Sequence, residues 1–588
     1  MNSTRSTRAC SISLLVLPLV IYAFGCSGGG SSGGGAASAQ VAGTPDAPAA
    51  VGERLFMETR FAQAFSVYVN SGGNVNDAKA GDPVMATVET TTPAAPITPG
   101  PFKGMSMNCR ACHLVDDVLT TPGGGMRTYA DFARRSPIPD RGDGKTHTPR
   151  NSPPLVNATL DRPEGILLHF DTEFNSIEDL IAATFTGRNF GWLPGEQAQA
   201  IAHIARVVRG DDGSGDTAQQ FDGLPYRFLF TGANPDIPDG FNLPPEYRIF
   251  VRTATDQEIF TAVVNVVAAY VNGLRFGRPA DNGTPIRSPF DVFLEINGLP
   301  QQPDSTTTPP ETPIAYSRRL RTLVNAPGFA PKFVTSNPNT PNGQFQFHPG
   351  QSFEFGATEL AGLKIFLAEP AATPGPDSPT EVANGKVGNC IACHAAPNFT
   401  DFRMHNTGTA QKEYDDIHGT GQFGAMVIPN KTTRDGNYDA YLPATETHPT
   451  ALGPFREIPS AGNPGLTDLG VWNVFANPDM PNPQAKIRNI LCNNQIPCPS
   501  DVTLLDQSIA RFKTPSLRDL GHSQPYMHTG QFDTLDNIIG FYLGVSAQAR
   551  GVGTPLRNGD SQLQAIALLG GDITPLVAFL KSLNEDYQ

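Results

Sequence analysis

Two copies of the pattern Cys-x-x-Cys-His occur in this sequence of 588 residues: CRACH at 109–113 and CIACH at 390–394. Two thiols three positions apart can reach the two vinyl groups of one porphyrin, and the imidazole that follows falls under the iron. The spacing therefore predicts covalent attachment of two haem c groups. A redox-active Cys-x-x-Cys pair or half of a zinc site also holds two such thiols, but neither explains a histidine directly after both pairs. The predicted haem-binding residues are Cys109, Cys112, His113, Cys390, Cys393 and His394.

The N-terminal segment has the order of an export signal followed by a tether. Arg5 and Arg8 precede an apolar run, and small residues then lead to Cys26. This order is typical of a secretory signal, and the final cysteine resembles a bacterial lipobox in which Cys26 carries a lipid anchor. An ordinary signal peptide or a short membrane anchor stays open, although the run is shorter than the roughly 20 residues of a membrane span. We expect a lipoprotein-type signal over 1–25 and a flexible Gly/Ser/Ala tether over 26–50.

Composition narrows the class of protein. The net charge of -14 argues against nucleic acid as a partner and suits a protein of the periplasm or the cell surface. The counts of 59 Gly and 54 Pro are high, which indicates long loops between modest helices. We expect a mainly α fold with two cytochrome c-like haem domains at 51–300 and 301–588, the second carrying a loop-rich insertion at 301–350.

Apolar periodicity predicts several helices and few strands. Helices are expected at 196–209, 256–274 and 359–369, because each range places apolar residues on one face. A further helix opens at Thr534, and the last helix is expected to be capped by Thr574-Pro575. The inner face of the helix after Thr534 carries Leu535, Ile538, Ile539 and Tyr542.

The remaining cysteines suggest one disulfide. Four of the 8 cysteines belong to the two motifs, and Cys10 and Cys26 lie in the N-terminal segment. Cys492 and Cys498 are left, separated by five residues that include a proline. In an oxidising compartment this pair is predicted to form a loop disulfide.

Several further segments, in a fixed order around the two motifs, carry a resemblance to a known family. They are RNSPPL at 150–155, FTD at 399–401, HNTG at 405–408, FKTPSLR at 512–518 and PYMHTG at 525–530. From about residue 105 to its end, the chain resembles the di-haem cytochrome c peroxidase family that includes MauG.

This resemblance implies a division of labour between the two haems. His113 would be the proximal ligand of a peroxide-reacting haem, and His394 that of an electron-transfer haem. The family also places a calcium ion between the domains. Here the Asn151 side chain and the backbone carbonyls of Ser523 and Pro525 would bind it, and such hard oxygen donors suit calcium.

The sixth ligand of the second haem differs within the family. Peroxidases use a Met, fourteen residues after the His that here is His528, whereas MauG uses a Tyr; in this chain that position is Tyr542. A core tyrosine with a satisfied hydroxyl is the alternative. Met527 is the second candidate ligand, since a thioether is the commoner partner of a low-spin haem c. A phenolate would lower the reduction potential of the haem.

The first haem needs an open or openable distal side. Peroxidases of the family close it with a His at the position that here holds Asp143, so the resemblance implies an open site, with His147 as the nearest histidine. Peroxide cleavage also needs a group that takes a proton from the near oxygen and returns it to the leaving one. The family uses a Glu before a helix, and Glu196 takes that place; a Glu favoured by the helix dipole is the alternative.

The chain departs from the family between the haems. Where the family has a Trp, this sequence has Phe170, which is a poorer relay for electrons. Trp192 either replaces it or lines a pocket. His405 and His528 are expected beside a haem rather than on its iron.

The resemblance implies a di-haem c oxidoreductase that reduces hydrogen peroxide, with electrons arriving through the second haem. The donor would be a small cytochrome c, a cupredoxin or an oxidisable protein side chain. Three alternatives stay open: MauG-like oxidation of a partner protein, oxygenase chemistry on an apolar substrate as in di-haem rubber oxygenases, and a non-catalytic electron-transfer cytochrome.

Overall fold

The computed structural model describes residues 47–77, 108–113, 135–136, 138–162, 164–232, 235–276, 287–335, 353–371 and 378–585. The predicted signal, the candidate lipid-anchor residue Cys26 and most of the predicted tether lie outside these ranges. Within them, no helix combines the length and the apolar character that crossing a membrane requires.

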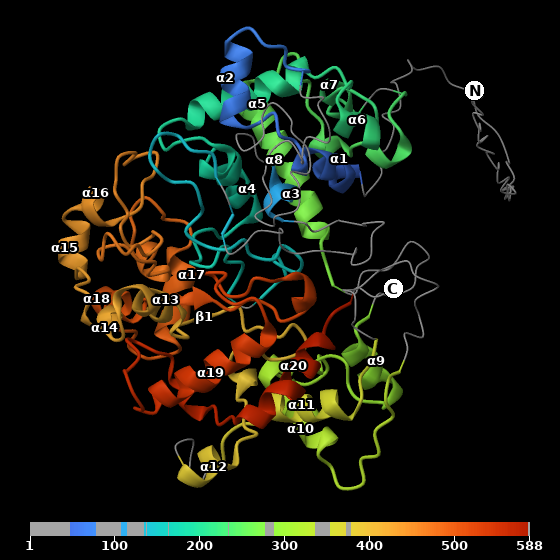
Figure 1. Cartoon of the computed structure of the whole chain (residues 1–588). Coiled ribbons are helices and arrows are strands. Elements are labelled where there is room, and N and C mark those ends of the chain that lie inside the picture. Colours follow the sequence, from blue (N-terminus) through green and yellow to red (C-terminus); the bar gives the residue numbers. More distant parts are fainter. Residues whose placement is uncertain are drawn as a thin grey trace, which may run out of the picture. The chain divides into compact units, whose positions relative to one another are not determined.

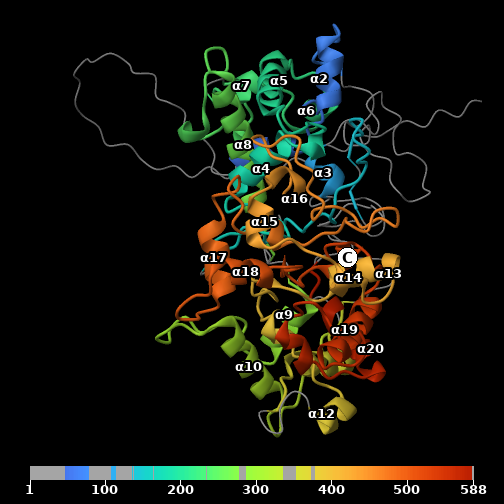
Figure 2. The same cartoon turned by 90° about the vertical axis from the view of Figure 1, so that its left-hand side faces the viewer.

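Helices dominate the described part of the chain (Figures 1 and 2), which confirms a mainly α fold. The α-helices are α1 (Ala47–Phe56), α2 (Gln63–Asn70), α3 (Cys109–Cys112), α4 (Ile177–Phe185), α5 (Gln197–Gly210), α6 (Asp216–Phe221), α7 (Tyr226–Leu229), α8 (Asp256–Gly273), α9 (Pro289–Ile296), α10 (Pro313–Val324), α11 (Ala357–Leu367), α12 (Pro379–Asn384), α13 (Thr409–His418), α14 (Gln422–Ala425), α15 (Lys431–Asp435), α16 (Tyr438–Tyr441), α17 (Gln484–Cys492), α18 (Asp501–Gln507), α19 (Leu535–Ala549) and α20 (Ile573–Lys581). Short 3-10 helices are η1 (Arg188–Phe190), η2 (Asp239–Phe241), η3 (Pro245–Tyr247), η4 (Cys390–Ala392), η5 (Val471–Asn473), η6 (Leu520–His522), η7 (Ser561–Ala565) and η8 (Gly570–Asp572).

Strands are scarce among the described residues, as predicted. β1 (Met404–His405) pairs antiparallel with β2 (Phe512–Lys513), and Met404 lies opposite Lys513. This short sheet joins two of the segments that carry the family resemblance.

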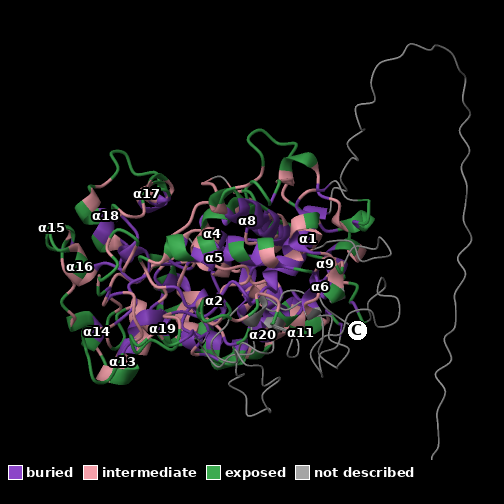
Figure 3. Ribbon diagram, turned by 90° about the horizontal axis from the view of Figure 1, so that it is seen from above, coloured by how far each residue is buried: buried purple, intermediate pink, exposed green. Residues whose placement is uncertain are grey.

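A first hydrophobic cluster surrounds α8, which packs against α1, α4 and α5 (Figure 3). The helix α8 begins with a capping box, in which the side chains of Thr255 and Glu258 satisfy each other's backbone N–H groups. Close packing of α1 on α8 requires Gly52, because a Cβ atom there would lie 2.0 Å from the Val266 carbonyl oxygen. The helices predicted at 196–209 and 256–274 are confirmed as α5 and α8.

A second hydrophobic cluster contains α9, α10, α11, α19 and α20. Gly362 allows α11 to approach α20, since a Cβ atom there would meet the Pro575 carbonyl oxygen at 1.9 Å. The Thr534 side chain accepts a hydrogen bond from the Asn537 backbone N–H and caps α19, as predicted. The helix predicted at 359–369 is confirmed as α11.

Two expectations for this second cluster were wrong. Asp572, not Thr574-Pro575, is the N-cap of α20; Thr574 and Pro575 lie in its first turn, where a proline's missing N–H has no helical partner to lose. The range 301–350 contains the helix α10, which starts from a Thr312 cap with Pro313 at its first position. High Pro and Thr content concealed this helix start, and 336–350 lies outside the described residues.

A third hydrophobic cluster is built mainly from the segment between β1 and β2, with Trp472 fully buried in it. The predicted disulfide between Cys492 and Cys498 is confirmed and closes the loop after α17. Phe170 belongs to this cluster although it precedes α4 in the chain. The predicted division into haem domains at residue 300 stays a prediction.

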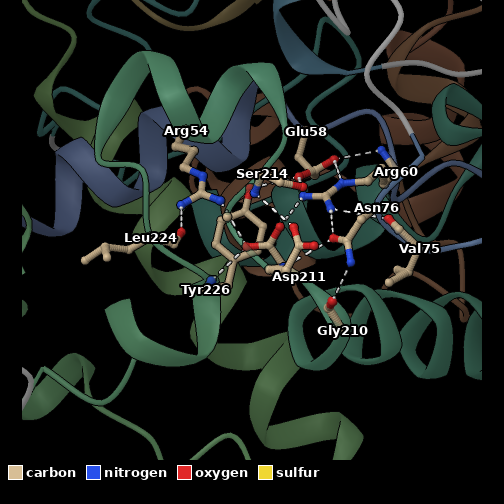
Figure 4. A network of polar contacts seen from close by, with 12 residues as sticks. Arg54, Glu58, Arg60, Val75, Asn76, Gly210, Asp211, Ser214, Leu224 and Tyr226 are labelled. Atoms are coloured by element: carbon tan, nitrogen blue, oxygen red, sulfur yellow. Dashed lines mark hydrogen bonds and ion pairs between the residues drawn. The ribbon is translucent and has the colours of Figure 1, made fainter.

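A buried polar network fixes the segment that follows α1 (Figure 4). The Asp211 carboxylate accepts hydrogen bonds from Arg54 and Arg60 at 3.0 Å each and from the Tyr226 backbone N–H at 2.9 Å. Glu58 is the second anion in contact with Arg60, at 2.6 Å. Arg54 also pairs with the buried Asp222 at 2.8 Å, so each arginine has a second carboxylate. Removing Asp211 would therefore leave buried hydrogen-bond donors without their acceptor rather than an isolated charge.

Asp211→Ala is therefore expected to lower the free energy of unfolding by about 3–5 kcal/mol, because three buried donors, on Arg54, Arg60 and the Tyr226 backbone, lose their acceptor. Urea unfolding followed by circular dichroism measures the change. The matched control is Asp256→Ala, whose exposed pair with Arg209 is expected to contribute less than about 1 kcal/mol. Equal, small effects of both substitutions would contradict the role given to the network.

Candidate haem centres

The second motif lies in a turn held by backbone hydrogen bonds. The His394 N–H donates to the Cys390 carbonyl at 2.7 Å, and the Asn389 N–H donates to the Ala368 carbonyl, just after α11, at 2.8 Å. The His394 Nδ1 lies 2.9 Å from the Phe399 carbonyl oxygen. A carbonyl only accepts, so Nδ1 carries the proton and Nε2 keeps a free lone pair for a metal.

One cavity contains this motif and both candidate sixth ligands. Cys390, Cys393 and His394 line it together with Met527 and Tyr542. The remaining wall is largely apolar and includes Phe366, Leu517, Leu535, Ile538, Ile539, Leu563, Ile566, Leu568, Leu576 and Leu580. Apolar walls, two thiols outside any disulfide and one imidazole with a free nitrogen are the features that a covalently attached porphyrin requires. The donor set fits haem c.

The cavity does not by itself choose between the two candidate ligands. Tyr542 is half-buried on α19, and burial, with Cys393 and Cys390 nearby, raises the pKa of its hydroxyl. Met527 has a left-handed backbone with φ of 68°, which turns the chain at the cavity wall. The choice of Tyr542 therefore stays a prediction.

Tyr542→Phe is expected to raise the reduction potential of the second haem, on the order of tens of millivolts or more, because an anionic oxygen donor stabilises the oxidised iron. Potentiometric titration measures this shift. The matched variant Met527→Leu should leave the low-spin spectrum unchanged, and the ferric wild-type protein should lack the near-infrared band of Met ligation. Loss of the low-spin signal in Met527→Leu but not in Tyr542→Phe would reverse the assignment.

His405 lies at the edge of the same cavity between two carboxylates. Its Nε2 is 2.8 Å from Asp401 and its Nδ1 is 2.6 Å from Asp560. Burial lowers the pKa of His405, but the Cys393 sulfur and the two carboxylates raise it well above its ordinary value. A thioether bond to haem would remove the charge of the sulfur, and the carboxylates alone would then favour the imidazolium. The sequence did not mark this cluster, because Asp401 and His405 are not on a helix and Asp560 is 155 residues from His405.

The first motif occupies the short helix α3 and the residue after it. The His113 N–H donates to the Cys109 carbonyl at 2.8 Å, and the Asn108 side chain donates to the Met57 carbonyl at 2.9 Å. Burial, with His169 nearby, lowers the pKa of His113 to about 4. The imidazole is therefore neutral near pH 7, the form that binds a metal.

The thiols of both motifs are unlike those of a redox-active pair. Burial raises the pKa of Cys112 to about 11 and, with Cys393 nearby, that of Cys390 to about 12. A catalytic Cys-x-x-Cys pair needs a lowered thiol pKa. Among the described residues, the one cluster with metal-ligand geometry is His169, Asp171 and Glu173, and no motif cysteine belongs to it. Neither the redox nor the zinc interpretation gains support.

Glu196 lies at the N-terminal end of α5, where the sequence predicted it. Its carboxylate accepts two hydrogen bonds from Arg141, at 2.9 and 3.0 Å, and one from the Leu193 backbone N–H at 2.8 Å. Burial raises the pKa of Glu196, but these hydrogen bonds outweigh burial and leave the pKa below its ordinary value. Arg141 was missed from sequence, because 55 residues separate the two partners. Nearby, Asp143 pairs with Arg188 at 2.8 Å.

His147, the histidine nearest to the expected distal position, is exposed, and its Nδ1 contacts the Thr146 hydroxyl at 2.9 Å. This side chain therefore makes a surface contact, and the open distal site stays a prediction.

The predicted calcium ligands are close together. The Asn151 amide nitrogen donates to the Pro525 carbonyl at 2.5 Å, and the Asn151 backbone N–H donates to the His528 carbonyl at 2.7 Å. Ser523 is buried two residues before Pro525. Calcium would require the Asn151 side-chain oxygen, rather than its nitrogen, to turn towards that carbonyl. The oxygens present fit a hard cation only after this rotation, so the calcium site stays a prediction.

Asn151→Ala is expected to weaken calcium binding by roughly tenfold or more, because the site loses its only predicted side-chain oxygen. Isothermal titration with calcium after exhaustive chelation measures the affinity. The control Asn482→Ala removes an exposed amide elsewhere and should leave the affinity unchanged. If the chelated wild-type protein takes up no calcium, the site does not exist.

Phe170 and Trp192, the two aromatic residues considered as relays between the haems, lie in different hydrophobic clusters. Phe170 lines the cavity beside His528, with ring centroids 6.3 Å apart, and His528 stacks on Phe512 at 3.5 Å. Trp192 is instead buried in the first hydrophobic cluster, where its indole N–H donates to the Phe61 carbonyl at 3.1 Å. Phe170, and not Trp192, therefore lies at the wall of this cavity.

Lys513 also lines this cavity and was missed from the sequence. Burial, with Arg162 nearby, lowers its pKa to about 7. In its protonated form Lys513 could pair with a porphyrin carboxylate. The strand β2 has only two residues, which is too short for a pattern that would mark this side chain.

The fold and the two motifs define a mainly α protein of the c-type haem class. No family model matches the chain. It is 28% identical to the cytochrome-c peroxidase IdrP2 of Denitromonas iodatirespirans over 208 residues, 35% of this chain and 38% of that protein. It is 26% identical to IdrP2 of Pseudomonas sp. (strain SCT) over 34% of this chain and 37% of that protein. It is also 35% identical to the methylamine utilization protein MauG of Methylophilus methylotrophus over 15% of this chain and 23% of that protein.

The curated relatives that the chain is similar to are thus cytochrome-c peroxidases and a MauG protein. The match spans less than two fifths of the length of these curated relatives. Among solved structures, a MauG-like protein associated with microbial copper homeostasis is similar with a TM-score of 0.39 and 14% identity, over 92% of this chain and 90% of that one. The diheme peroxidase BthA from Burkholderia thailandensis gives a TM-score of 0.33 and 14% identity, over 92% and 87%.

Proposed function

We propose that the protein is a di-haem c-type peroxidase that reduces hydrogen peroxide with electrons delivered through the second haem. The observation that carries this proposal is the apolar cavity in which Cys390, Cys393 and His394 meet two candidate sixth ligands. A six-coordinate haem there would exchange electrons without binding substrate, which leaves the chemistry with peroxide to the haem at the first motif.

The haem at the first motif would supply an iron that binds peroxide and takes part in its reduction. His113 would hold this haem through its neutral imidazole. Glu196 would take a proton from one peroxide oxygen and return it to the other, which leaves as water. Arg141 orients this carboxylate through its two hydrogen bonds. The balanced reaction uses two electrons and two protons for each peroxide and forms two molecules of water.

An aromatic wall separates the cavity of the second motif from the segment that contains Arg150 and Asn151. It consists of Phe170, His528 and Phe512. Electrons from the second haem would cross this wall. A phenylalanine is hard to oxidise, so the wall acts as a packed medium rather than as a residue that carries a radical. Calcium bound at Asn151 would brace the contact of this segment with the loop at Pro525.

The proposed reaction needs an electron donor that meets the enzyme outside the cytoplasm. A small cytochrome c or a cupredoxin would donate the electrons, and haem c attachment together with the N-terminal signal favours the periplasm or the cell surface. The lipid anchor at Cys26 would keep the enzyme at a bacterial membrane. No nucleic acid takes part, consistent with the negative net charge.

A second candidate function is MauG-like oxidation of a partner protein's side chain. Tyr542 favours it, because phenolate ligation lowers the potential of the second haem and makes that haem a poorer acceptor of electrons from ordinary donors. Oxygenase chemistry and a plain electron-transfer role have no observation of their own in their favour.

Spectroscopy of the purified ferric protein tests the proposal. Electron paramagnetic resonance should show one high-spin and one low-spin haem in equal amounts, because one iron has an open side and the other has two protein ligands. Two low-spin haems that stay low-spin after reduction would leave no place for peroxide, and the electron-transfer role would then be favoured.

A further inference from the structure

A hollow of about 860 Å³ lies over α10, α11 and the start of α20, outside the haem cavity. The helix α11 packs against both α10 and α20 (Figure 1). Six charged residues line the hollow: Arg318, Arg321, Lys364, Lys386, Glu369 and Asp572. Its lining also includes the apolar residues Ala361, Ile365 and Pro575. We call it the basic hollow.

The charges of the basic hollow do not cancel. Glu369 pairs with Arg318 at 2.7 Å and with Arg321 at 3.5 Å. The Asp572 carboxylate is buried and accepts hydrogen bonds from two backbone N–H groups, those of Lys386 at 3.0 Å and Leu569 at 2.8 Å.

Within the described part of the chain, Lys364 and Lys386 take part in no ion pair. Four cations and two anions leave an excess of two positive charges in the hollow, whereas the chain as a whole carries -14.

The basic hollow is next to the backbone that carries the second motif. Lys386 precedes Cys390 by four residues, so their Cα atoms are at most about 14 Å apart. The Gly388 N–H donates to the carbonyl of Ile365, a residue that lines the hollow, at 3.0 Å, which ties this backbone to the hollow. A protein docked here would lie beside the backbone that leads to Cys390.

We propose that the basic hollow is the docking site for an electron-donor protein with an acidic patch. Apolar residues together with charged ones are the usual composition of a transient protein interface. The acidic patch would meet Lys364 and Lys386, while the negative charge elsewhere on the chain would repel it from other orientations. This inference rests on the proposed function, in which electrons enter through the second haem. Two docking events, each delivering one electron, would serve one peroxide and two protons.

The test measures equilibrium binding to the haem-loaded protein. The probes are an acidic small c-type cytochrome and a basic one of matched size, each titrated at low and high salt. Wild-type protein should bind the acidic cytochrome more tightly, and salt should weaken that complex. The double variant Lys364→Glu/Lys386→Glu should weaken it by roughly tenfold or more at low salt. The control Lys332→Glu makes the same charge change at an exposed lysine outside the hollow and should change affinity less than about twofold.

The outcomes separate this inference from the proposed function. Equal affinity of the wild type for both cytochromes, or an unchanged affinity in the double variant, would overturn the docking site while peroxide turnover with a small-molecule reductant could persist. Binding of inorganic phosphate at the hollow without binding of the acidic cytochrome would also overturn it. Conversely, tight and lysine-dependent binding in a protein that fails to reduce peroxide would support the docking site and remove the peroxidase proposal. The double variant should keep the haem spectra of the wild type.

Discussion

Replacing Cys390 and Cys393 together with serine is expected to leave the protein with one covalent haem. Both thiols line the apolar cavity with His394, and a hydroxyl does not form the thioether bond that holds the porphyrin. Mass spectrometry under denaturing conditions should show two haem additions for the wild type and one for this variant. Because denaturation removes haem held only by His394, the measurement counts covalent attachment alone.

The chain provides a matched control for that experiment. Cys492→Ser/Cys498→Ser also replaces two cysteines, but it removes only the disulfide after α17. This control should keep both haem additions, and Cys109→Ser/Cys112→Ser should again lose one. A wild-type protein with fewer than two additions, or a second-motif variant that keeps two, would contradict the assignment of the motifs.

Glu196→Gln is expected to lower the rate of peroxide reduction by roughly 10²-fold, because a glutamine cannot carry the proton between the two oxygens. The Gln side chain keeps the size of Glu196 and can still accept a hydrogen bond from Arg141, so the haem spectra should not change. Stopped-flow mixing of the reduced protein with hydrogen peroxide measures the rate. The control is Glu446→Gln, since Glu446 accepts a hydrogen bond from Gly195 in the same turn at 3.0 Å.

The pH dependence gives a second signature of Glu196. Hydrogen bonds from Arg141 and Leu193 hold its pKa below the ordinary value, so the charged form persists well into the acid range. The carboxylate acts as a base only when deprotonated; the rate should therefore be full above this lowered pKa and should fall as the pH drops through it. That acid limb should disappear in Glu196→Gln. A control variant as slow as Glu196→Gln would return Glu196 to a structural role at the start of α5.

Local sequence signals predicted the helices whose caps and apolar faces agree. The helices α8 and α19 have a Thr cap followed by an apolar stripe, and both begin at the expected residue. Pattern reading failed for α10, because Thr312 and Pro313 lie among other prolines and threonines that are typical of loops. The N-cap of α20 was predicted at the wrong residue. Asp572 accepts a hydrogen bond from the Leu569 backbone N–H and ends η8, and the apolar pattern of α20 gives no sign of this preceding turn.

The residues of the candidate haem sites are likewise of two kinds: those that the sequence predicts and those that only the tertiary fold brings together. The haem-binding residues lie in two contiguous motifs, so their spacing alone predicts haem attachment. Arg141, the partner of Glu196, is 55 residues away in the sequence. The two arginine partners of Asp211, Arg54 and Arg60, are each more than 150 residues away. Such pairs are made by the tertiary fold, and a single sequence gives no periodicity that marks them. The basic hollow likewise gathers residues from α10, α11, the start of α20 and the loop that contains Lys386.

Stoichiometric titration of the fully reduced protein with hydrogen peroxide, without oxygen, tests the central claim most directly. Two reduced haems hold two electrons, and reduction of one peroxide consumes two, so one equivalent should oxidise both haems. The absorbance changes of the two haems should therefore end together at one equivalent of peroxide. Haems that stay reduced in the presence of excess peroxide would contradict the peroxidase account.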